Sequence, residues 1–255
     1  AAEIEFLKAL RAATVKHGIV LIFDEVMTSR LGPGGMQQST GVIPDMTSLG
    51  KYLGGGMSFG AFGGRADLMQ RYDPTRADAV SHAGTFNNNV LSMAAGVKGL
   101  RDIYTAAAAT ALSVAGETLK ARVNALARKH DADFQMTGVG SILNFHFHRG
   151  TITKPEDWWP VTDAAAKRLD DKQKLFHLDM LEAGQYLARR GFVTLSLPMA
   201  EPMHERFLAA IDEFLTVRAA VLDTIGREHA RRVFEGFAAA GIDAIVFKGA
   251  ALAET

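Results

Sequence analysis

The sequence has no cysteine, no excess of charge of either sign and no long hydrophobic run. Without cysteine, neither a disulfide nor a thiolate-bound metal can form, and the chain suits the reducing cytoplasm. Its 28 lysines and arginines balance 28 aspartates and glutamates, so charge gives no reason to expect nucleic acid or an anionic membrane as partner. A membrane-spanning helix needs about 20 apolar residues in a row. We therefore expect a cytoplasmic protein that binds neither nucleic acid nor membrane.

What is present fits a globular α/β protein. The chain has 255 residues, of which 48% are hydrophobic, enough for one large domain or two modest ones. Apolar periodicity predicts helices over residues 3–16, 106–129, 162–183 and 202–240, and strands over 19–23, 60–62, 141–147, 192–197 and 242–247. The run 19–23 is apolar throughout, so we expect this strand to be buried. Glycines and prolines predict a loop over residues 28–44.

One aspartate and one lysine stand out by position. Asp24 follows the apolar run 19–23, and Lys51 lies between Gly50 and the glycines at 54–56. Pyridoxal phosphate needs a lysine for its Schiff base and a carboxylate against its pyridinium nitrogen, so the pair suits this cofactor. A Gly-Lys pair alone is more often a surface feature. A phosphate-binding loop is excluded because Asp45 and Tyr52 stand where its pattern requires glycine and Ser or Thr.

Four motifs occur in a fixed order in the first 100 residues: LIFDEVMT at 21–28, PDMTSLGK at 44–51, GGGMSFGAFGG at 54–64 and AGTFNNN at 83–89. Together they resemble the class III aminotransferases of fold type I, in the branch of the glutamate-1-semialdehyde aminomutases and β-phenylalanine-type aminotransferases. The resemblance implies an α/β fold with a mostly parallel sheet in a large domain and a smaller α+β C-terminal domain. The family is longer upstream, so we expect a C-terminal portion that lacks the N-terminal part of the fold. Residues 1–105 would complete the cofactor-binding domain, and 106–255 would form the small one.

The resemblance also implies roles for individual residues. Lys51 would form the Schiff base and shuttle a proton, and Asp24 would keep the ring nitrogen protonated. Val26 would pack under the ring, unless it is plain core. Gly84 and Thr85 would contact the cofactor phosphate of the neighbouring subunit, in a homodimer with shared active sites. For Thr85 the alternative is a loop residue before a capped helix, and both can hold.

Arg190 precedes the strand predicted over 192–197. In this fold such a position can face the mouth of the active site, and arginine pairs well with a carboxylate. We expect it to bind a substrate carboxylate, with Arg189 as its rival and a solvated surface arginine as the alternative. His146 and His148 share one face of a strand, but no third ligand is evident, so we expect no metal site.

The expected activity is transfer of an amino group between an amino acid and a 2-oxo acid, with pyridoxal phosphate as cofactor. A β-amino acid is one option for the donor. Two alternatives stay open: an aminomutase that acts within one substrate through the same residues, and a truncated, non-catalytic homologue that only dimerises.

Overall fold

The computed structural model describes residues 4–160 and 162–216, and the chain forms two compact units, residues 1–115 and 116–255. The division falls inside the long helix α5 (Ala106–Lys129), whereas the predicted boundary lies after residue 105. The functional roles assigned to the two parts remain predictions. Each unit is described by itself below.

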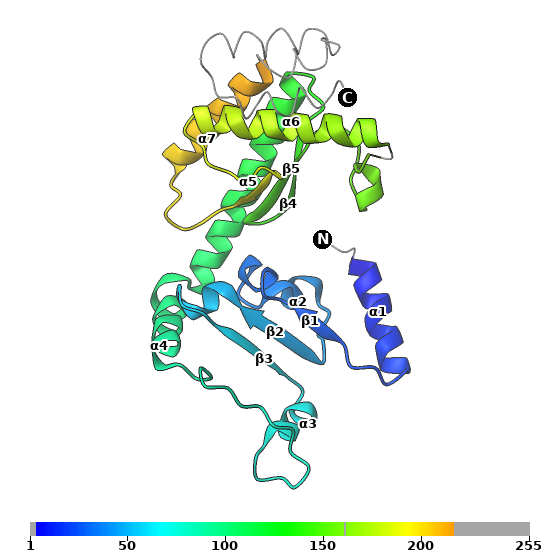
Figure 1. Cartoon of the computed structure of the whole chain (residues 1–255), viewed down its shortest axis with the longest axis vertical. Coiled ribbons are helices and arrows are strands. Elements are labelled where there is room, and N and C mark those ends of the chain that lie inside the picture. Colours follow the sequence, from blue (N-terminus) through cyan, green and yellow to red (C-terminus); the bar gives the residue numbers. More distant parts are fainter. Residues whose placement is uncertain (1–3, 161, 217–255) are drawn as a thin grey trace. The chain divides into compact units, whose positions relative to one another are not determined.

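The first unit is built on a three-stranded sheet of order β1-β2-β3 (Figure 1). Strand β1 (Ile22–Asp24) runs parallel to β2 (Met46–Gly50), which pairs antiparallel with β3 (Gly60–Gly64). Because β1 and β2 are parallel, their carboxyl ends lie at the same edge of the sheet. Asp24 at the end of β1 is in register with Ser48, and Lys51 follows the end of β2.

The first unit also contains helices and short helical turns. They are α1 (Ile4–Lys16), η1 (Thr28–Leu31), α2 (Gly35–Thr40), η2 (Lys51–Gly54), α3 (Ala66–Met69), η3 (Gln70–Tyr72), α4 (Val90–Lys98) and the π-helical turn η4 (Gly99–Ile103). The predicted loop over 28–44 is thus partly wrong, because it holds η1 and α2. The glycines that suggested a loop lie around α2, with Gly35 at its first residue and left-handed Gly41 at its end.

The prediction of a buried strand over 19–23 is also wrong in part. The strand begins only at Ile22, and Ile19, Val20 and Ile22 are each between 42% and 58% exposed. Leu21 is the member of the run that is buried. The reason is that β1 is an edge strand of this sheet and, among the described residues, pairs only with β2. An apolar run indicates a strand but does not show how much of it other elements bury.

The second unit carries an antiparallel sheet of order β4-β5-β6, formed by β4 (Gln135–Val139), β5 (Ile142–His146) and β6 (Phe192–Thr194). Helices α5, α6 (Asp163–Glu182) and α7 (Glu201–Phe214) and the turn η5 (Pro155–Asp157) complete its described part (Figure 1). Its core is a cluster of rings from Phe134, Phe145, Phe176 and Phe214. The end of the helix predicted over 202–240 and the strand predicted over 242–247 lie outside the described residues. Over residues 4–160 and 162–216, none of the helices has the length and apolar character needed to cross a membrane.

Candidate active site

Asp24 lies at the carboxyl end of β1 with its side chain exposed. Its Oδ1 accepts two hydrogen bonds, from the Ser48 hydroxyl at 3.0 Å and from the backbone N–H of Val26 at 3.1 Å. Its Oδ2 accepts none from the described residues. The carboxylate is therefore held through one oxygen and can accept a ligand hydrogen through the other.

Lys51 follows β2 directly and begins the turn η2. Its φ angle is 54°, in the left-handed region that residues other than glycine rarely adopt. Such a conformation costs about 1–3 kcal/mol and persists where the surroundings impose it, which is common at functional sites. The side chain is exposed and forms no ion pair with any residue in the described ranges. Its amine can therefore meet a ligand at the edge of the sheet where Asp24 also lies.

Helix α4 holds the lysine turn through close backbone contacts. A Cβ on Gly96 of α4 would lie 2.4 Å from the carbonyl oxygen of Leu53 in the turn. A Cβ on Gly55, whose φ is +60°, would lie 2.3 Å from the carbonyl oxygen of Ala95. Both distances are shorter than real contacts of this kind, so only glycine allows the turn and the helix to approach this closely.

Val26 completes the group at this edge. A Cβ on Gly50 would lie 3.5 Å from Cγ1 of Val26, so the valine side chain lies beside the residue that precedes Lys51. The structure thus brings together three predicted site residues: Asp24, Val26 and Lys51. An available carboxylate oxygen, an apolar side chain and an exposed amine suit the ring nitrogen, the ring face and the aldehyde carbon of pyridoxal phosphate. The residues present therefore fit that cofactor.

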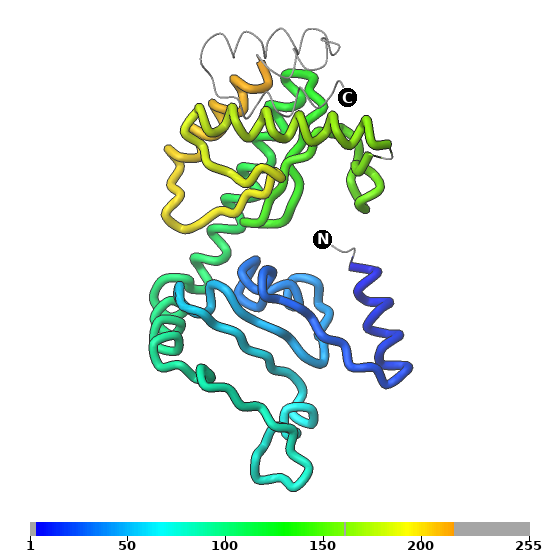
Figure 2. Tube along the Cα trace, in the orientation of Figure 1, coloured from blue at the N-terminus to red at the C-terminus, as the bar shows by residue number. Residues whose placement is uncertain are grey.

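Gly84 and Thr85 lie elsewhere, on the extended segment between η3 and α4, which Figure 2 traces. Both are exposed, and the carbonyl of Gly84 accepts a hydrogen bond from the N–H of Asn87 at 3.0 Å. Asn89 caps α4, with Oδ1 accepting from the N–H groups of Leu91 and Ser92. The loop and the cap predicted as the alternative are therefore present. Within the described part of the chain, no hydrogen bond joins Thr85 to Asp24 or Lys51.

The two arginines before β6 differ in their contacts. Arg189 donates to Oδ1 of Asp170 at 2.8 Å, an ion pair between partly exposed side chains. Arg190 lies with its guanidinium carbon 5.4 Å from the centre of the Phe192 ring. None of the described carboxylates pairs with Arg190, so of the two it is the one whose guanidinium is available to an acid.

Sequence reasoning missed the role of Glu25, which is only 1% exposed between Asp24 and Val26. Its carboxylate accepts hydrogen bonds from the N–H of Met36 (2.8 Å), the N–H of Gln37 (2.9 Å) and the hydroxyl of Thr28 (3.1 Å). Glu25 therefore anchors the segment 28–40 beside the site. Its position next to Asp24 gave no signal of this, since the two backbone donors lie more than ten residues further on.

Sequence reasoning also missed the role of Ser48, although the pairing register of β1 and β2 points to this residue. In a parallel pair, the residue that aligns with Asp24 on β2 is a candidate hydrogen-bond partner.

His146 accepts or donates one hydrogen bond with the Thr137 hydroxyl at 2.9 Å, and burial lowers the pKa of its imidazole. Among residues 4–160 and 162–216, no three His, Cys, Asp or Glu side chains gather into a group that could hold a metal ion.

Comparison with known proteins bears on this site. Residues 1–172 match the profile of the family "Aminotransferase class-III". The β-phenylalanine transaminase of Variovorax paradoxus is 47% identical over 218 residues, which are 86% of this chain and 48% of that protein. A glutamate-1-semialdehyde 2,1-aminomutase of Polynucleobacter asymbioticus is 40% identical over 189 residues, 74% of this chain and 42% of its own length.

A solved structure agrees with the fold as well. The crystal structure of a β-phenylalanine aminotransferase from Variovorax paradoxus superposes with a TM-score of 0.80 at 45% identity, covering 86% of this chain and 49% of that one. This confirms the predicted fold class. The chain spans about half the length of the curated relatives it matches. Since the family profile covers well over half of its residues, the chain belongs to the class III aminotransferase family.

Proposed function

We propose that the complete protein is a pyridoxal-phosphate-dependent aminotransferase, which moves an amino group between an amino acid and a 2-oxo acid. The observation that carries the proposal is the placement of Asp24 and Lys51 at neighbouring ends of the parallel strands β1 and β2, in a chain of this family. The name of the Variovorax relative supports a β-amino acid as one substrate. The cytoplasmic location expected from the sequence is part of the same proposal.

Each residue at the edge of the sheet has a task in this reaction. The bound cofactor supplies an electron sink for the substrate carbanion. Asp24 would accept a hydrogen bond from the ring nitrogen through Oδ2 and keep that nitrogen protonated, while Ser48 and the N–H of Val26 hold Oδ1. Lys51 would bind the cofactor covalently and, when displaced by substrate, carry the proton between the substrate carbon and the cofactor. Val26 would support the ring face.

The direct test is chemical labelling of the complete natural protein loaded with pyridoxal phosphate. Borohydride reduction followed by peptide mapping should place the pyridoxyl group on Lys51, and the Lys51→Ala variant should take up no label. A pyridoxyl group on another lysine would end this proposal.

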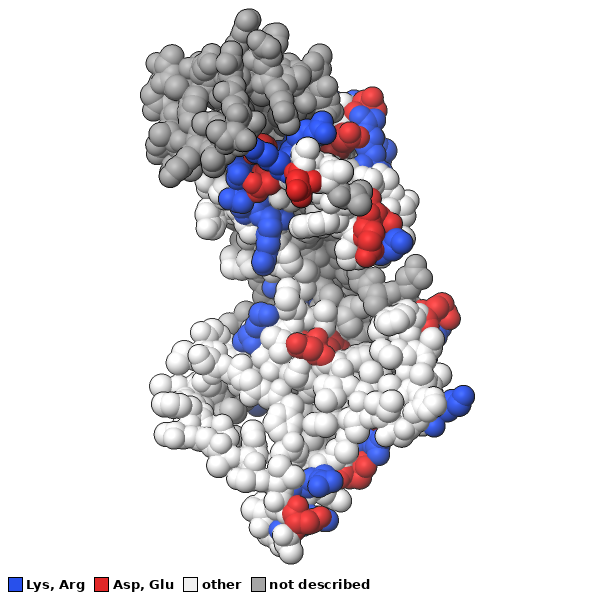
Figure 3. All heavy atoms as spheres, turned by 45° about the vertical axis from the view of Figure 1, so that its right-hand side comes forward, with Lys and Arg blue, Asp and Glu red and all other residues white. Residues whose placement is uncertain are grey.

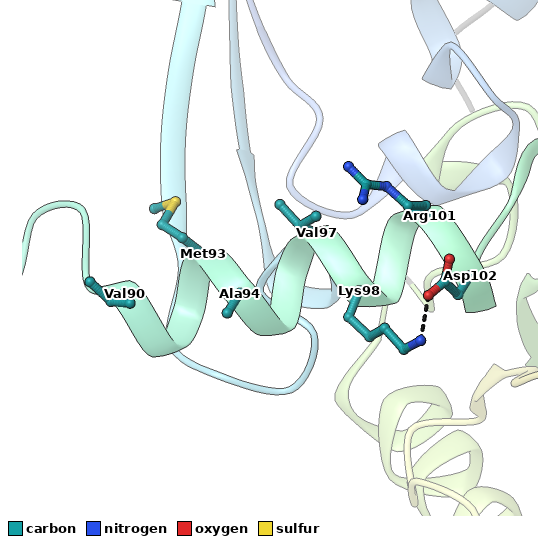
Figure 4. Close-up of a pocket in the computed structure, with 7 residues that line it drawn as sticks. All are labelled: Val90, Met93, Ala94, Val97, Lys98, Arg101 and Asp102. Carbon is teal, nitrogen blue, oxygen red and sulfur yellow. Dashed lines mark ion pairs between the residues drawn. The ribbon is translucent and has the colours of Figure 1, made fainter.

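A homodimer with shared active sites is the second part of the proposal. Support comes from an apolar surface on and before α4, where Phe86 is 84% exposed, Val90 77% and Leu91 66%. A groove of about 460 Å³ opens along the same helix, apolar at Val90, Met93, Ala94 and Val97 and charged at Lys98, Arg101 and Asp102 (Figure 4). In Figure 3 much of the visible surface of the first unit carries no charged residue.

Thr85 lies just before that surface in the sequence. In a dimer formed through this surface, the Thr85 hydroxyl would reach the active site of the partner subunit. Hybrid dimers test this: mixing a Lys51→Ala protein with a Thr85→Ala protein should restore part of the activity, because one of the two sites then holds both native residues. No recovery, with subunit exchange verified, would place Thr85 in its own chain's site or outside any site.

Substrate recognition is assigned to Arg190 because its guanidinium has no described carboxylate partner, whereas Arg189 pairs with Asp170. Arg190→Ala should raise KM for the oxo acid about tenfold to a hundredfold, since a charged hydrogen bond contributes about 1.5–3 kcal/mol. An amine donor without a carboxylate should be much less affected. Arg189→Ala is the matched control, and an effect there with none at Arg190 would reverse the assignment.

An aminomutase remains the second candidate, favoured by the identity to the Polynucleobacter aminomutase. Both activities would use Asp24 and Lys51. They differ in whether the first product leaves before the amino group is returned. A burst of oxo product in the absence of an acceptor would support the transferase. The third alternative, a truncated, non-catalytic homologue that only dimerises, predicts that the complete protein shows no cofactor absorbance.

A further inference from the structure

We propose that Tyr104 is a positioning residue for Lys51, acting through the ring of Tyr52; this rests on the proposed function. Tyr104 directly follows the π-helical turn η4, and such turns are frequent at functional sites. Its ring meets the ring of Tyr52 edge to face, with centroids 4.9 Å apart and planes at 65°. Tyr52 is the next residue after Lys51, so the contact bears on the lysine turn itself.

Tyr104 is itself fixed at its far end. Its hydroxyl donates a hydrogen bond to the carbonyl oxygen of Arg30 at 2.5 Å. Arg30 lies in η1, within the segment 28–40 that Glu25 anchors next to Asp24. Burial raises the pKa of the Tyr104 phenol, so this hydroxyl stays protonated and remains a donor. Tyr104 therefore connects the anchored segment to the turn that carries the lysine.

The lysine turn needs such support because of its backbone. Lys51 has a φ of 54°, and a left-handed non-glycine residue keeps that conformation only where its surroundings impose it. Gly96 and Gly55 fit the turn against the backbone of α4, but glycines supply no side chain to hold the residue after Lys51. The Tyr52–Tyr104 contact provides that restraint.

The consequence concerns the placement of the amine. If the turn becomes more mobile, the position of the Lys51 amine relative to Asp24 varies, and the attached cofactor is bound less tightly. Turnover should then fall while KM for substrate changes little, because no substrate contact is removed. Loss of fold would instead lower every measured property together.

The test uses the complete natural protein loaded with pyridoxal phosphate. Tyr104→Leu removes the ring, and Tyr104→Phe keeps the ring but loses the hydroxyl. Ser113→Ala is the matched control, since the Ser113 hydroxyl donates to the carbonyl of Leu31 at 3.0 Å and so anchors the same segment without touching Tyr52. Tyr52→Leu removes the ring from the other side of the contact, and the double variant Tyr52→Leu/Tyr104→Leu completes a cycle.

Two readouts separate positioning from folding: the rate of cofactor loss, and the pH midpoint at which the absorbance of the lysine-bound cofactor changes. Tyr104→Leu should lose cofactor about tenfold faster and shift the midpoint by about half a pH unit. Tyr104→Phe keeps the ring contact but loses the bond to Arg30, so both values should lie between those of Tyr104→Leu and the wild type. Ser113→Ala should match the wild type. Tyr52→Leu should reproduce the shift, with no further shift in the double variant.

Several results would overturn the inference. They are equal effects in Ser113→Ala and Tyr104→Leu, unchanged spectra in Tyr104→Leu, and additive shifts in the double variant. Should Tyr104→Leu not fold, Tyr52→Leu alone decides, and an unchanged midpoint there also overturns it. A wild-type protein without a lysine-bound chromophore would overturn the proposed function itself, and this is distinguishable because the wild type is measured first.

Discussion

The hydroxyl of Ser48 donates a hydrogen bond to Oδ1 of Asp24 across the parallel strands β1 and β2, at 3.0 Å. The N–H of Val26 donates to the same oxygen. Two donors on one oxygen orient the carboxylate and leave its other oxygen toward solvent. Ser48, three residues before Lys51, thereby couples the strand that carries the lysine to the orientation of the acid.

The first prediction concerns this pair. Asp24→Asn nearly keeps the shape but loses the charge, so kcat should fall at least about 100-fold, or about 2.7 kcal/mol of barrier. Ser48→Ala keeps the Asp24 carboxylate but removes one hydrogen bond that orients it. The variant should lower kcat about tenfold, as expected for one hydrogen bond to a charged group. Steady-state kinetics of both variants, at matched cofactor content, provide the measurement. Near-normal turnover in a folded Asp24→Asn protein contradicts the assigned role.

The second prediction concerns the packing of the lysine turn on α4. A Cβ at Gly96 would lie 2.4 Å from the Leu53 carbonyl oxygen, so Gly96→Ala must push the turn and the helix apart. We expect cofactor affinity to fall about tenfold, because Lys51 moves with the turn. Gly99→Ala is the control on the adjoining turn η4: its Cβ would meet only Cα of Gly55, at 3.5 Å. Equilibrium dialysis against pyridoxal phosphate should show weaker binding in Gly96→Ala than in Gly99→Ala. Equal affinities would show that the turn accommodates the added methyl group without moving Lys51.

The third prediction concerns Glu25. Its Oε2 accepts from the N–H of Met36 and its Oε1 from the N–H of Gln37, so an amide at this position must turn its own N–H₂ toward a donor. Glu25→Gln should therefore release the segment 28–40 locally. Hydrogen exchange followed by mass spectrometry should show faster exchange at Met36 and Gln37. Peptides from β3 serve as the internal control, and unchanged protection at α2 would refute the anchoring role.

The fourth prediction concerns the stability of the first unit toward acid. Asp45 is buried, and hydrogen bonds from Arg11, from the N–H of Leu21 and from Arg65 hold the pKa of its carboxyl well below its usual range. A group with a lowered folded pKa contributes its full stability above the unfolded value, about 3.9, and loses it as the pH falls toward the folded pKa. The urea midpoint should therefore decline as the pH drops below about 4.

Asp45→Asn checks this contribution. The variant should have a lower urea midpoint than the wild type at pH 7, since Arg11 loses its charged partner and Arg65 keeps only Asp67. It should also show a weaker dependence on pH below about 4. Asp78→Asn is the control, because Asp78 pairs with Arg76 at the surface and exposed pairs contribute little. Parallel pH profiles for the wild type and Asp45→Asn would show that Asp45 is not the group responsible.

The long helices were predictable because their signal is local. Residues 106–129 form α5 as predicted, and residues 162–183 contain α6, since apolar periodicity over many residues defines a helix without reference to neighbours. Strand β4 was not predicted. Its sequence, Gln135–Val139, contains a glycine and two polar residues, and it forms a strand because β5 pairs with it along its length.

By itself, the sequence determined the family and predicted which acid and which lysine serve the cofactor, because motifs in a fixed order are readable without coordinates. Only the tertiary structure decided how those residues are held. Ser48 meets Asp24 because β1 and β2 pair in parallel, and Glu25 binds amides more than ten residues away because the segment 28–40 folds back over it. The contact of Tyr52 with Tyr104 joins residues on η2 and beyond η4. Such contacts depend on register and backbone approach between distant segments, and no local pattern in the chain encodes either one.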